Sequence, residues 1–473
     1  MLSMGVVRGI GYGLFGPPED FGEAARGLNV STVRAYVYWH QVEPEPGRFD
    51  WALVDRLLGQ VAGWGRLWLT VCSSSPWATR TPTTFLPPSP PKDLGAYTRF
   101  VAELVRHCAG QVDYWQCENE PSNSGLLWAG TAEEYAELLA GFASAVRSVP
   151  SAGRVVLGGL GYDVLSEAPG TGPWRFFETV LAAAPTSFDL VDVHTYDDPQ
   201  RIPDHFAAVR SLLERFGCAR PLVVGEYGGP TFFQFPEAVR AIEQATTEAM
   251  ADPSAADGLQ PPDRRVMRRL YDRLGELPAE LRQFLDDCPP AVAARRDRVA
   301  CREVVTRNVT AFAEGAAATF CWHLAPELAG YSDPLSLIGL VSARLALLDF
   351  RDGALTDAQP AAATFRMLAA ALREADGVRR IPLGERPDVR AFDVVFPPGS
   401  GRALQILWRA AEPFAGDTTA HEAFEWQWVH PGLHVADAFA TAVPVPAWAS
   451  GRVAVPLSAT PILLSSTPLH TIG

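Results

Sequence analysis

Eight short apolar runs alternate with longer segments of helical spacing, and this alternation leaves few folds open to the chain. Runs rich in Val, Leu and Ile between Ala/Leu/Glu/Arg segments are typical of parallel strands joined by crossover helices. Eight strands are the number that closes a β/α barrel, so we predict a (β/α)8 TIM barrel of the α/β class. The predicted strands span residues 8–13, 32–38, 67–72, 114–119, 155–159, 190–194, 222–225 and 318–322.

The chain has 473 residues, more than one hydrophobic core usually supports, so we expect a second, smaller domain. About 90 residues separate the last two predicted strands, and the surplus, about 235–290, has a charged helical pattern that predicts an insertion capping the barrel. After a final predicted helix at 361–375, short alternating runs with Gly/Pro turns predict a small β-sandwich. We therefore expect a barrel domain over 1–376 and a β-sandwich domain over 377–473.

The balance of charge excludes several classes of partner. A formal net charge of −14, with no compensating Lys/Arg stripe, disfavours nucleic acid and anionic membrane surfaces. We find neither a signal-peptide pattern nor an apolar run near the ~20 residues that span a bilayer. Seven scattered cysteines fit reduced thiols. These features predict a cytoplasmic location, and no pattern sets the oligomeric state.

Two glutamates follow predicted strands at the place where β/α barrels carry their reactive groups, the carboxyl ends of the strands. Glu120 ends the fourth run and Glu226 ends the seventh. Glycosidic bond cleavage needs two carboxyl groups, one to protonate the departing oxygen and one to attack or stabilise the anomeric carbon. Strands four and seven lie on opposite sides of a barrel mouth, so these carboxyl groups can face each other across a sugar.

Three motifs resemble those of the clan A glycoside hydrolases, in particular the group that includes β-xylosidases and α-L-iduronidases. They are Asn119-Glu120-Pro121, the segment 34–51, and His194-Thr-Tyr196. The resemblance implies a retaining enzyme that cleaves a β-linked glycoside through a covalent glycosyl-enzyme, with Glu120 as acid/base and Glu226 as nucleophile. It implies a carbohydrate substrate and no cofactor.

The same resemblance implies roles for other residues near the glutamates. Asn119 would hydrogen-bond the sugar 2-hydroxyl, and Arg34 would hold the nucleophile. His194 and Tyr196 would orient the two carboxyl groups, and Trp322 would form an aromatic platform under the sugar ring. Further candidates for substrate binding are Trp77 and Trp39. One departure from the family pattern is Glu118, which precedes Asn119 where an aromatic or small residue is commoner.

We expect different surroundings to give Glu120 and Glu226 different protonation states. A cation such as Arg34 keeps Glu226 ionised, whereas shielding of Glu120 beside Trp115 or Trp322 keeps it protonated to higher pH.

Other interpretations of the sequence remain open. Arg34 and His194 could instead be a structural ion pair and a satisfied core histidine. The chain could also be a sugar-binding barrel without turnover. A metal-dependent barrel hydrolase lacks the histidines it would need, since His421 begins a zinc-protease-like pattern that has Glu425 in the second histidine's place. We therefore expect no metal site.

Overall fold

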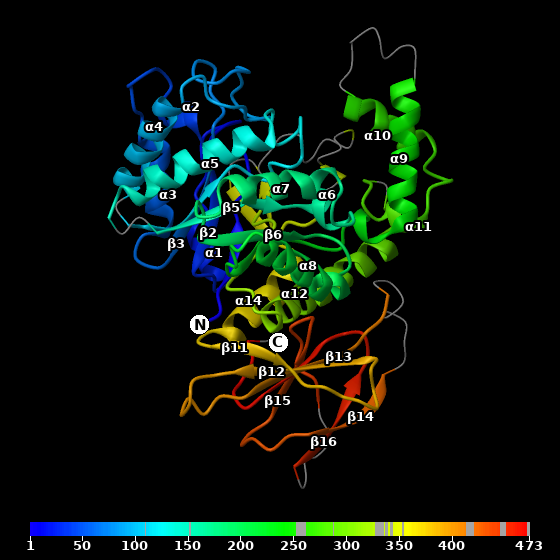
Figure 1. The fold of residues 1–473 in the computed structure, drawn as a ribbon. Helices are drawn as coiled ribbons and strands as arrows, with labels where there is room; N and C mark the ends of the chain where they lie inside the picture. The colour runs from blue at the N-terminus through cyan, green and yellow to red at the C-terminus, as the bar shows by residue number, and fades with distance from the viewer. Residues whose placement is uncertain are drawn as a thin grey trace.

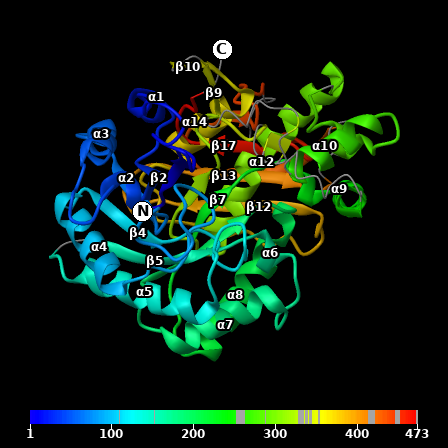
Figure 2. The same ribbon diagram turned by 90° about the horizontal axis from the view of Figure 1, so that it is seen from above.

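The computed structural model describes residues 1–108, 110–150, 153–251, 262–286, 288–326, 335, 339–340, 344–351, 354–412, 421–444 and 451–470. Eight parallel strands close into a barrel in chain order, which confirms the predicted fold class (Figures 1 and 2). The barrel strands are β1 (Met4–Val7), β2 (Thr32–Tyr38), β3 (Arg66–Cys72), β4 (Val112–Cys117), β5 (Arg154–Leu160), β6 (Leu190–Thr195), β7 (Leu222–Tyr227) and β8 (Thr319–Cys321).

The longer helices cover the barrel because they present apolar stripes to the outer faces of the strands. In α3, for example, Val54, Leu57, Leu58 and Val61 are the buried residues. The helices between β1 and β7 are α1 (Gly22–Gly27), α2 (Trp39–Val42), α3 (Ala52–Val61), α4 (Leu94–Cys108), α5 (Ala132–Arg147), α6 (Tyr162–Leu165), α7 (Gly172–Ala183), η1 (Pro199–Arg201) and α8 (Ile202–Arg215). Within the described residues, no helix is long and apolar enough to cross a bilayer.

The first strand lies earlier than the sequence pattern suggested, so the prediction of a strand at 8–13 is wrong. The strand is Met4–Val7, where Gly5 pairs with Thr32 of β2 and with Phe320 of β8. Beyond it, Gly9 and Gly13 have φ values of +115° and +70°, which take the chain out of the extended conformation. Residues 8–13 therefore form part of the loop at the barrel mouth.

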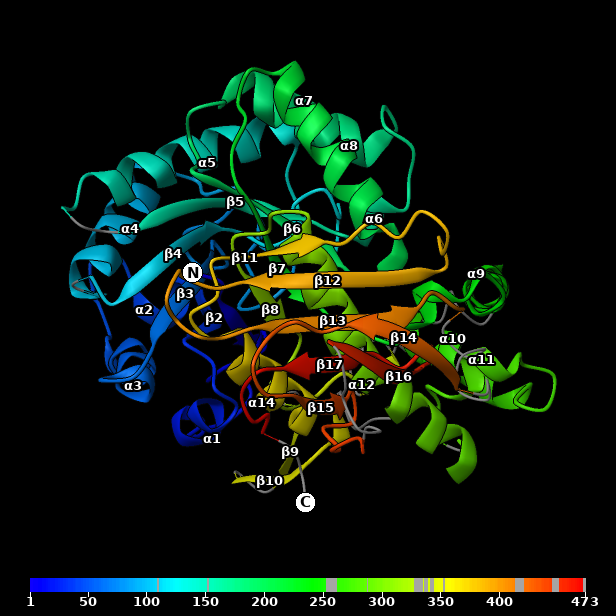
Figure 3. The same ribbon diagram turned by 90° about the horizontal axis from the view of Figure 1, so that it is seen from below.

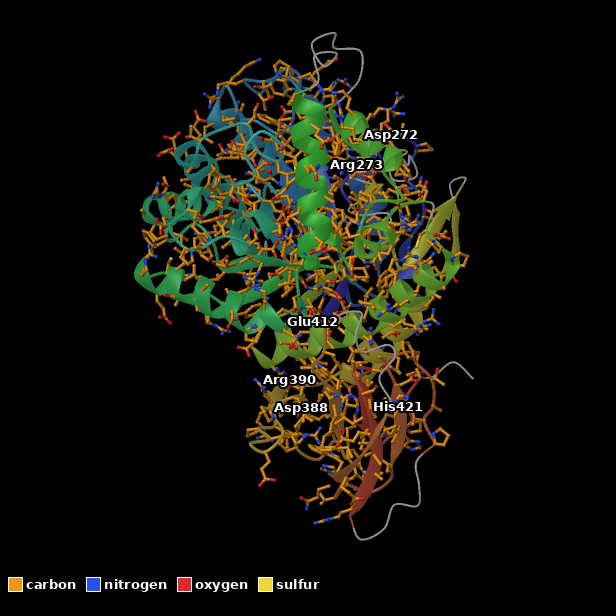
Figure 4. The ribbon with its side chains drawn as sticks, turned by 90° about the vertical axis from the view of Figure 1, so that its right-hand side faces the viewer. Asp272, Arg273, Asp388, Arg390, Glu412 and His421 are labelled. Carbon is orange, nitrogen blue, oxygen red and sulfur yellow. The ribbon has the colours of Figure 1, made fainter. Side chains whose placement is uncertain are left out.

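A helical insertion follows β7, as the pattern of residues 235–290 predicted. It comprises η2 (Phe232–Gln234), α9 (Pro236–Ala251), α10 (Pro262–Asp272) and α11 (Ala279–Arg282), and α12 (Pro290–Ala313) then leads to β8. The insertion has its own apolar core, in which Phe232 and Phe235 cluster with buried residues of α9 and α10. Arg273, directly after α10, forms an ion pair with Glu248 of α9 at 3.3 Å (Figure 4).

The carboxyl-terminal part is antiparallel, as predicted, and packs below the barrel against α12 and α14 (Pro360–Leu372) (Figures 1 and 3). One sheet has the order β11-β12-β13-β17-β15, and a second pairs β14 with β16. In the chain, a small hairpin of β9 (Leu348–Arg351) and β10 (Ala354–Ala358) comes after β8 and before these sheets. The strands of the two sheets are β11 (Gly377–Arg380), β12 (Val389–Val395), β13 (Leu404–Arg409), β14 (Glu422–Gln427), β15 (His434–Asp437), β16 (Arg452–Leu457) and β17 (Ile462–Ser465).

Candidate active site

The two glutamates meet at the barrel mouth although β4 and β7 are far apart in the chain. One carboxylate oxygen of Glu120, one of Glu226 and one ring nitrogen of His194 all lie within 4.8 Å of one another. The side chain of Glu120 is 14% exposed and that of Glu226 is 5% exposed, so both are largely removed from water. The site therefore holds a close and nearly dry pair of carboxyl groups.

Both oxygens of Glu226 are held by donors from the barrel interior. Oε1 accepts hydrogen bonds from Arg34 Nη1 at 2.9 Å and from the Tyr36 hydroxyl at 2.8 Å. Oε2 accepts one from the Tyr196 hydroxyl at 2.7 Å. These bonds come from three different side chains, so they fix the carboxyl group of Glu226 in position.

Arg34 is fully buried on β2 and organises several strands at once. Besides Glu226 it donates to Gln116 Oε1 at 2.7 Å and to Asn119 Oδ1 at 2.8 Å. Burial disfavours its charged form, but the neighbouring Tyr36 and Glu226 raise the pKa of Arg34 above its ordinary value. A permanent cation thus lies beneath the carboxyl pair.

His194 links the two glutamates to a third acidic residue deeper in the barrel. Its Nδ1 lies 2.5 Å from Glu120 Oε1, and its Nε2 lies 2.9 Å from Asp192 Oδ2. Burial opposes protonation of the ring, but Glu226 and Asp192 raise the pKa of His194 to about 10. His194 is therefore an imidazolium at neutral pH that donates to a carboxyl group at each ring nitrogen.

Glu120 has the opposite environment from Glu226. Burial raises the pKa of Glu120, the bond from His194 lowers it, and the charges of Glu226 and Asp163 raise it further. Trp115 does not supply this shielding, because it belongs to the main core together with residues of α4 and α5. The backbone at Glu120 is left-handed, with φ of +40°, a conformation that non-glycine residues adopt mostly where the surrounding structure enforces it.

The structure brings some of the other predicted residues to this mouth and leaves two elsewhere. Trp322 is buried in one hydrophobic cluster with Tyr36 and Tyr196, whose hydroxyls bond Glu226. Trp39, in contrast, is fully buried in the main core, where its ring contacts Trp77 at 5.3 Å between ring centroids. The structure therefore does not place Trp39 and Trp77 beside the carboxyl pair, and packing accounts for both rings.

Three residues of the network, Tyr36, Gln116 and Asp192, were not predicted from the sequence. Tyr36 bonds Glu226, while Gln116 bonds both Arg34 and Asp192. The sequence does contain a pattern that could have identified them, because each is a polar residue inside an apolar strand run. Side chains alternate along a strand, and each of these residues lies an even number of positions from one that points into the barrel. Such a residue is costly to bury unless it belongs to a bonded network.

The same cluster is where a metal would be sought. Among the residues that the structure describes, Glu120, His194 and Glu226 form the one group whose donor atoms lie close enough to share an ion. Both nitrogens of His194 already face carboxylates, and a protonated imidazole offers no lone pair to a metal. The donor set therefore fits carboxyl chemistry better than metal binding.

Comparisons with known proteins agree on the architecture. No protein-family model and no curated protein matches the sequence. The structure is similar over 98% of this chain and 81% of the other to a family 39 glycoside hydrolase from Bacteroides cellulosilyticus WH2, with a TM-score of 0.61 and 15% identity. A glucosidase from Croceicoccus marinus matches over 98% of both chains, with a TM-score of 0.56 and 14% identity.

A third similar structure is a family 39 β-xylosidase from Caulobacter crescentus, which matches over 95% of this chain and 91% of the other with a TM-score of 0.56 and 12% identity. These similarities extend through the barrel and the antiparallel region alike. The chain thus has the fold of the clan A glycoside hydrolases, a β/α barrel followed by a β-domain.

Proposed function

We propose that the protein is a retaining glycoside hydrolase that cleaves a β-linked glycoside. The observation that carries this proposal is the short separation of the carboxyl pair, with oxygens of Glu120 and Glu226 within 4.8 Å. Retaining glycosidases hold their carboxyl groups about 5–5.5 Å apart, whereas inverting ones leave about 6.5–9.5 Å for a water molecule. An approach of one oxygen from each group to within 4.8 Å supports the shorter separation, that of a retaining enzyme.

The environments of the two carboxyl groups support different roles. Glu226, held by Arg34 and two tyrosine hydroxyls, is the carboxylate that attacks the anomeric carbon as the bond to the leaving oxygen breaks. Glu120, with its raised pKa, gives its proton to that oxygen. In the second half-reaction Glu120 takes a proton from water, the water oxygen bonds the anomeric carbon, and Glu226 leaves as a carboxylate.

Neighbouring side chains fit the binding of a sugar ring at this point. The Asn119 amide oxygen accepts a hydrogen bond from Arg34, so the amide nitrogen of Asn119 is left as the donor for a sugar hydroxyl. Trp322 provides an apolar ring in the hydrophobic cluster that contains Tyr36 and Tyr196, and such a ring suits the C–H face of a sugar. The similar structures include a β-xylosidase and a glucosidase, which supports a glycosidase.

Two variants test the proposal on a panel of aryl β-glycosides. Glu226→Gly should lower kcat/KM by roughly 10⁴ or more on every substrate that the wild type cleaves. Glu120→Ala should lose most activity on substrates with poor leaving groups and much less on dinitrophenyl glycosides, which need no acid. Glu167→Gln, an exposed glutamate near α6, is the matched control and should behave as wild type.

Unchanged hydrolysis by Glu226→Gly would refute the assignment of the nucleophile. Sugar binding without turnover of any substrate would instead identify a carbohydrate-binding barrel.

A further inference from the structure

A third carboxyl group, that of Asp163, lies beside the proposed acid. Asp163 is the second residue of α6, directly after β5. A Cβ atom built on Gly161 would stand 2.6 Å from Glu120 Oε1 and 2.9 Å from Asp163 Oδ1. Since both oxygens approach the same point, they are at most the sum of these distances apart, about 5.5 Å. The absence of a side chain at Gly161 is what allows this approach.

The carboxyl group of Asp163 is held by Ser122 through one oxygen, and its other oxygen lies toward Glu120. Its Oδ2 accepts a hydrogen bond from the Ser122 hydroxyl at 2.8 Å, and Ser122 belongs to the same loop as Glu120. Its Oδ1 is buried and accepts no well-oriented hydrogen bond from the described residues. Burial raises the pKa of this carboxyl group, whereas the Ser122 hydroxyl and the backbone N–H groups of Val164 and Asp163 lower it. Oδ1 is on the side that approaches Glu120.

We propose that Asp163 is a positioning residue for Glu120: its charge opposes loss of the Glu120 proton and so keeps Glu120 in its acid form. The effect on the proton of Glu120 is independent of any substrate. Its consequence for turnover rests on the function proposed above.

Three charged groups around Glu120 affect its ionisation, and the effect of Asp163 differs from that of the other two. His194, on β6, bonds Glu120 and favours its ionised form, while Glu226, on β7, and Asp163, on α6, oppose ionisation. In a glycosyl-enzyme the carboxyl group of Glu226 is an ester without charge, so its repulsion of Glu120 disappears. Asp163 takes no part in that bond, and its repulsion persists through both half-reactions.

The size of the effect follows from the separation of the two groups. Two charges about 5.5 Å apart shift each other's titration by roughly half a pH unit in a water-like medium and by roughly two units at an effective dielectric constant of ~20. Burial also raises the pKa of Asp163, so the two carboxyl groups titrate as a coupled pair. Such a pair loses its two protons in two steps, and the second step occurs at the higher pH. A neutral side chain at position 163 would shift the titration of Glu120 to lower pH, because it removes the repulsion between the two charges.

The direct test is an NMR titration of the enzyme labelled with ¹³C at the glutamate carboxyl carbons, with Glu120→Gln used to assign the signal. In Asp163→Asn the titration midpoint of Glu120 should fall by roughly 0.5–2 pH units relative to wild type. Asp163→Ala should show the same direction, which rules out a new bond from the asparagine amide as the cause. Glu167→Gln removes a charge from the exposed segment after α6 and should leave the midpoint unchanged.

Kinetics supply the second readout. The alkaline limb of the kcat/KM profile on an aryl glycoside reports the free-enzyme acid, so Asp163→Asn should move that limb to lower pH by the same amount. An unmoved Glu120 midpoint in both variants refutes the role of Asp163, whatever the activity. A lowered midpoint in an enzyme that cleaves no glycoside supports that role and refutes the proposed function instead.

Discussion

The buried carboxyl group of Glu118 should make the stability of the protein depend on pH in a predictable direction. Glu118 is fully buried beside the end of β3, and its Oε1 accepts a hydrogen bond from the Ser73 N–H at 2.8 Å. Its Oε2 is buried without a hydrogen-bond partner among the described residues. Burial, only partly offset by the Ser73 bond, raises the pKa of Glu118 from 4.5 to about 8. The carboxyl group is therefore neutral in the folded protein at pH 7.

The sign of the effect follows from linkage. The folded pKa exceeds the unfolded one, so the contribution of Glu118 to stability is fully present below about pH 4.5 and is lost as the pH rises through 8. For a shift of this size, the loss between pH 5 and pH 9 is about 4 kcal/mol of unfolding free energy. Glu118→Gln keeps the shape of the neutral acid and cannot ionise, so it should remove this loss.

The assay is urea unfolding followed by tryptophan fluorescence at pH 5, 7 and 9. Wild type and Glu118→Gln should have similar unfolding free energies at pH 5, and the variant should be the more stable at pH 9 by roughly 2–4 kcal/mol. Glu137→Gln, on the exposed face of α5, is the control and should follow wild type. A constant difference between Glu118→Gln and wild type across this pH range would refute the reasoning.

Two further perturbations probe the network around the carboxyl pair. Arg34→Gln removes the guanidinium group that binds Glu226, so the free energy of unfolding should fall by about 3–5 kcal/mol and kcat/KM by at least roughly 100-fold. Unfolding and rate measurements that match wild type would contradict the ion pair. Gly161→Ala places a Cβ 2.5 Å from the Glu120 carboxyl carbon, so kcat on poor leaving groups should fall while dinitrophenyl substrates are spared. Equal loss on both substrate types would show that the displaced group is not the acid.

Much of the architecture could be predicted because a fully buried strand must be a continuous apolar run. This rule located β2 through β8 to within a few residues, and the switch to short alternating runs predicted the antiparallel region. It misplaced β1 because Met4–Val7 is only four residues long, while apolar residues such as Ile10 and Tyr12 continue beyond it in the loop.

The position of a residue along a strand predicts which end of the barrel it lies at, but not which side chains it contacts. Glu120 and Glu226 could be selected because a polar residue that ends an apolar run points to the barrel mouth. Trp39 also follows a strand, yet its side chain turns into the core, where its indole N–H donates to Glu43. Asp163 was not selected because its place beside Glu120 depends on the close approach at Gly161, which arises only from three-dimensional packing.

The most direct test of the central claim is to identify the residue that becomes covalently attached to a sugar. Incubation with activated 2-deoxy-2-fluoro-β-glycosides, whose slow hydrolysis allows the intermediate to accumulate, should inactivate the enzyme. Mass spectrometry of peptic fragments should then locate one added sugar on Glu226. Attachment to another residue, or turnover with inversion of the anomeric centre and no adduct, would contradict the proposed role of the carboxyl pair.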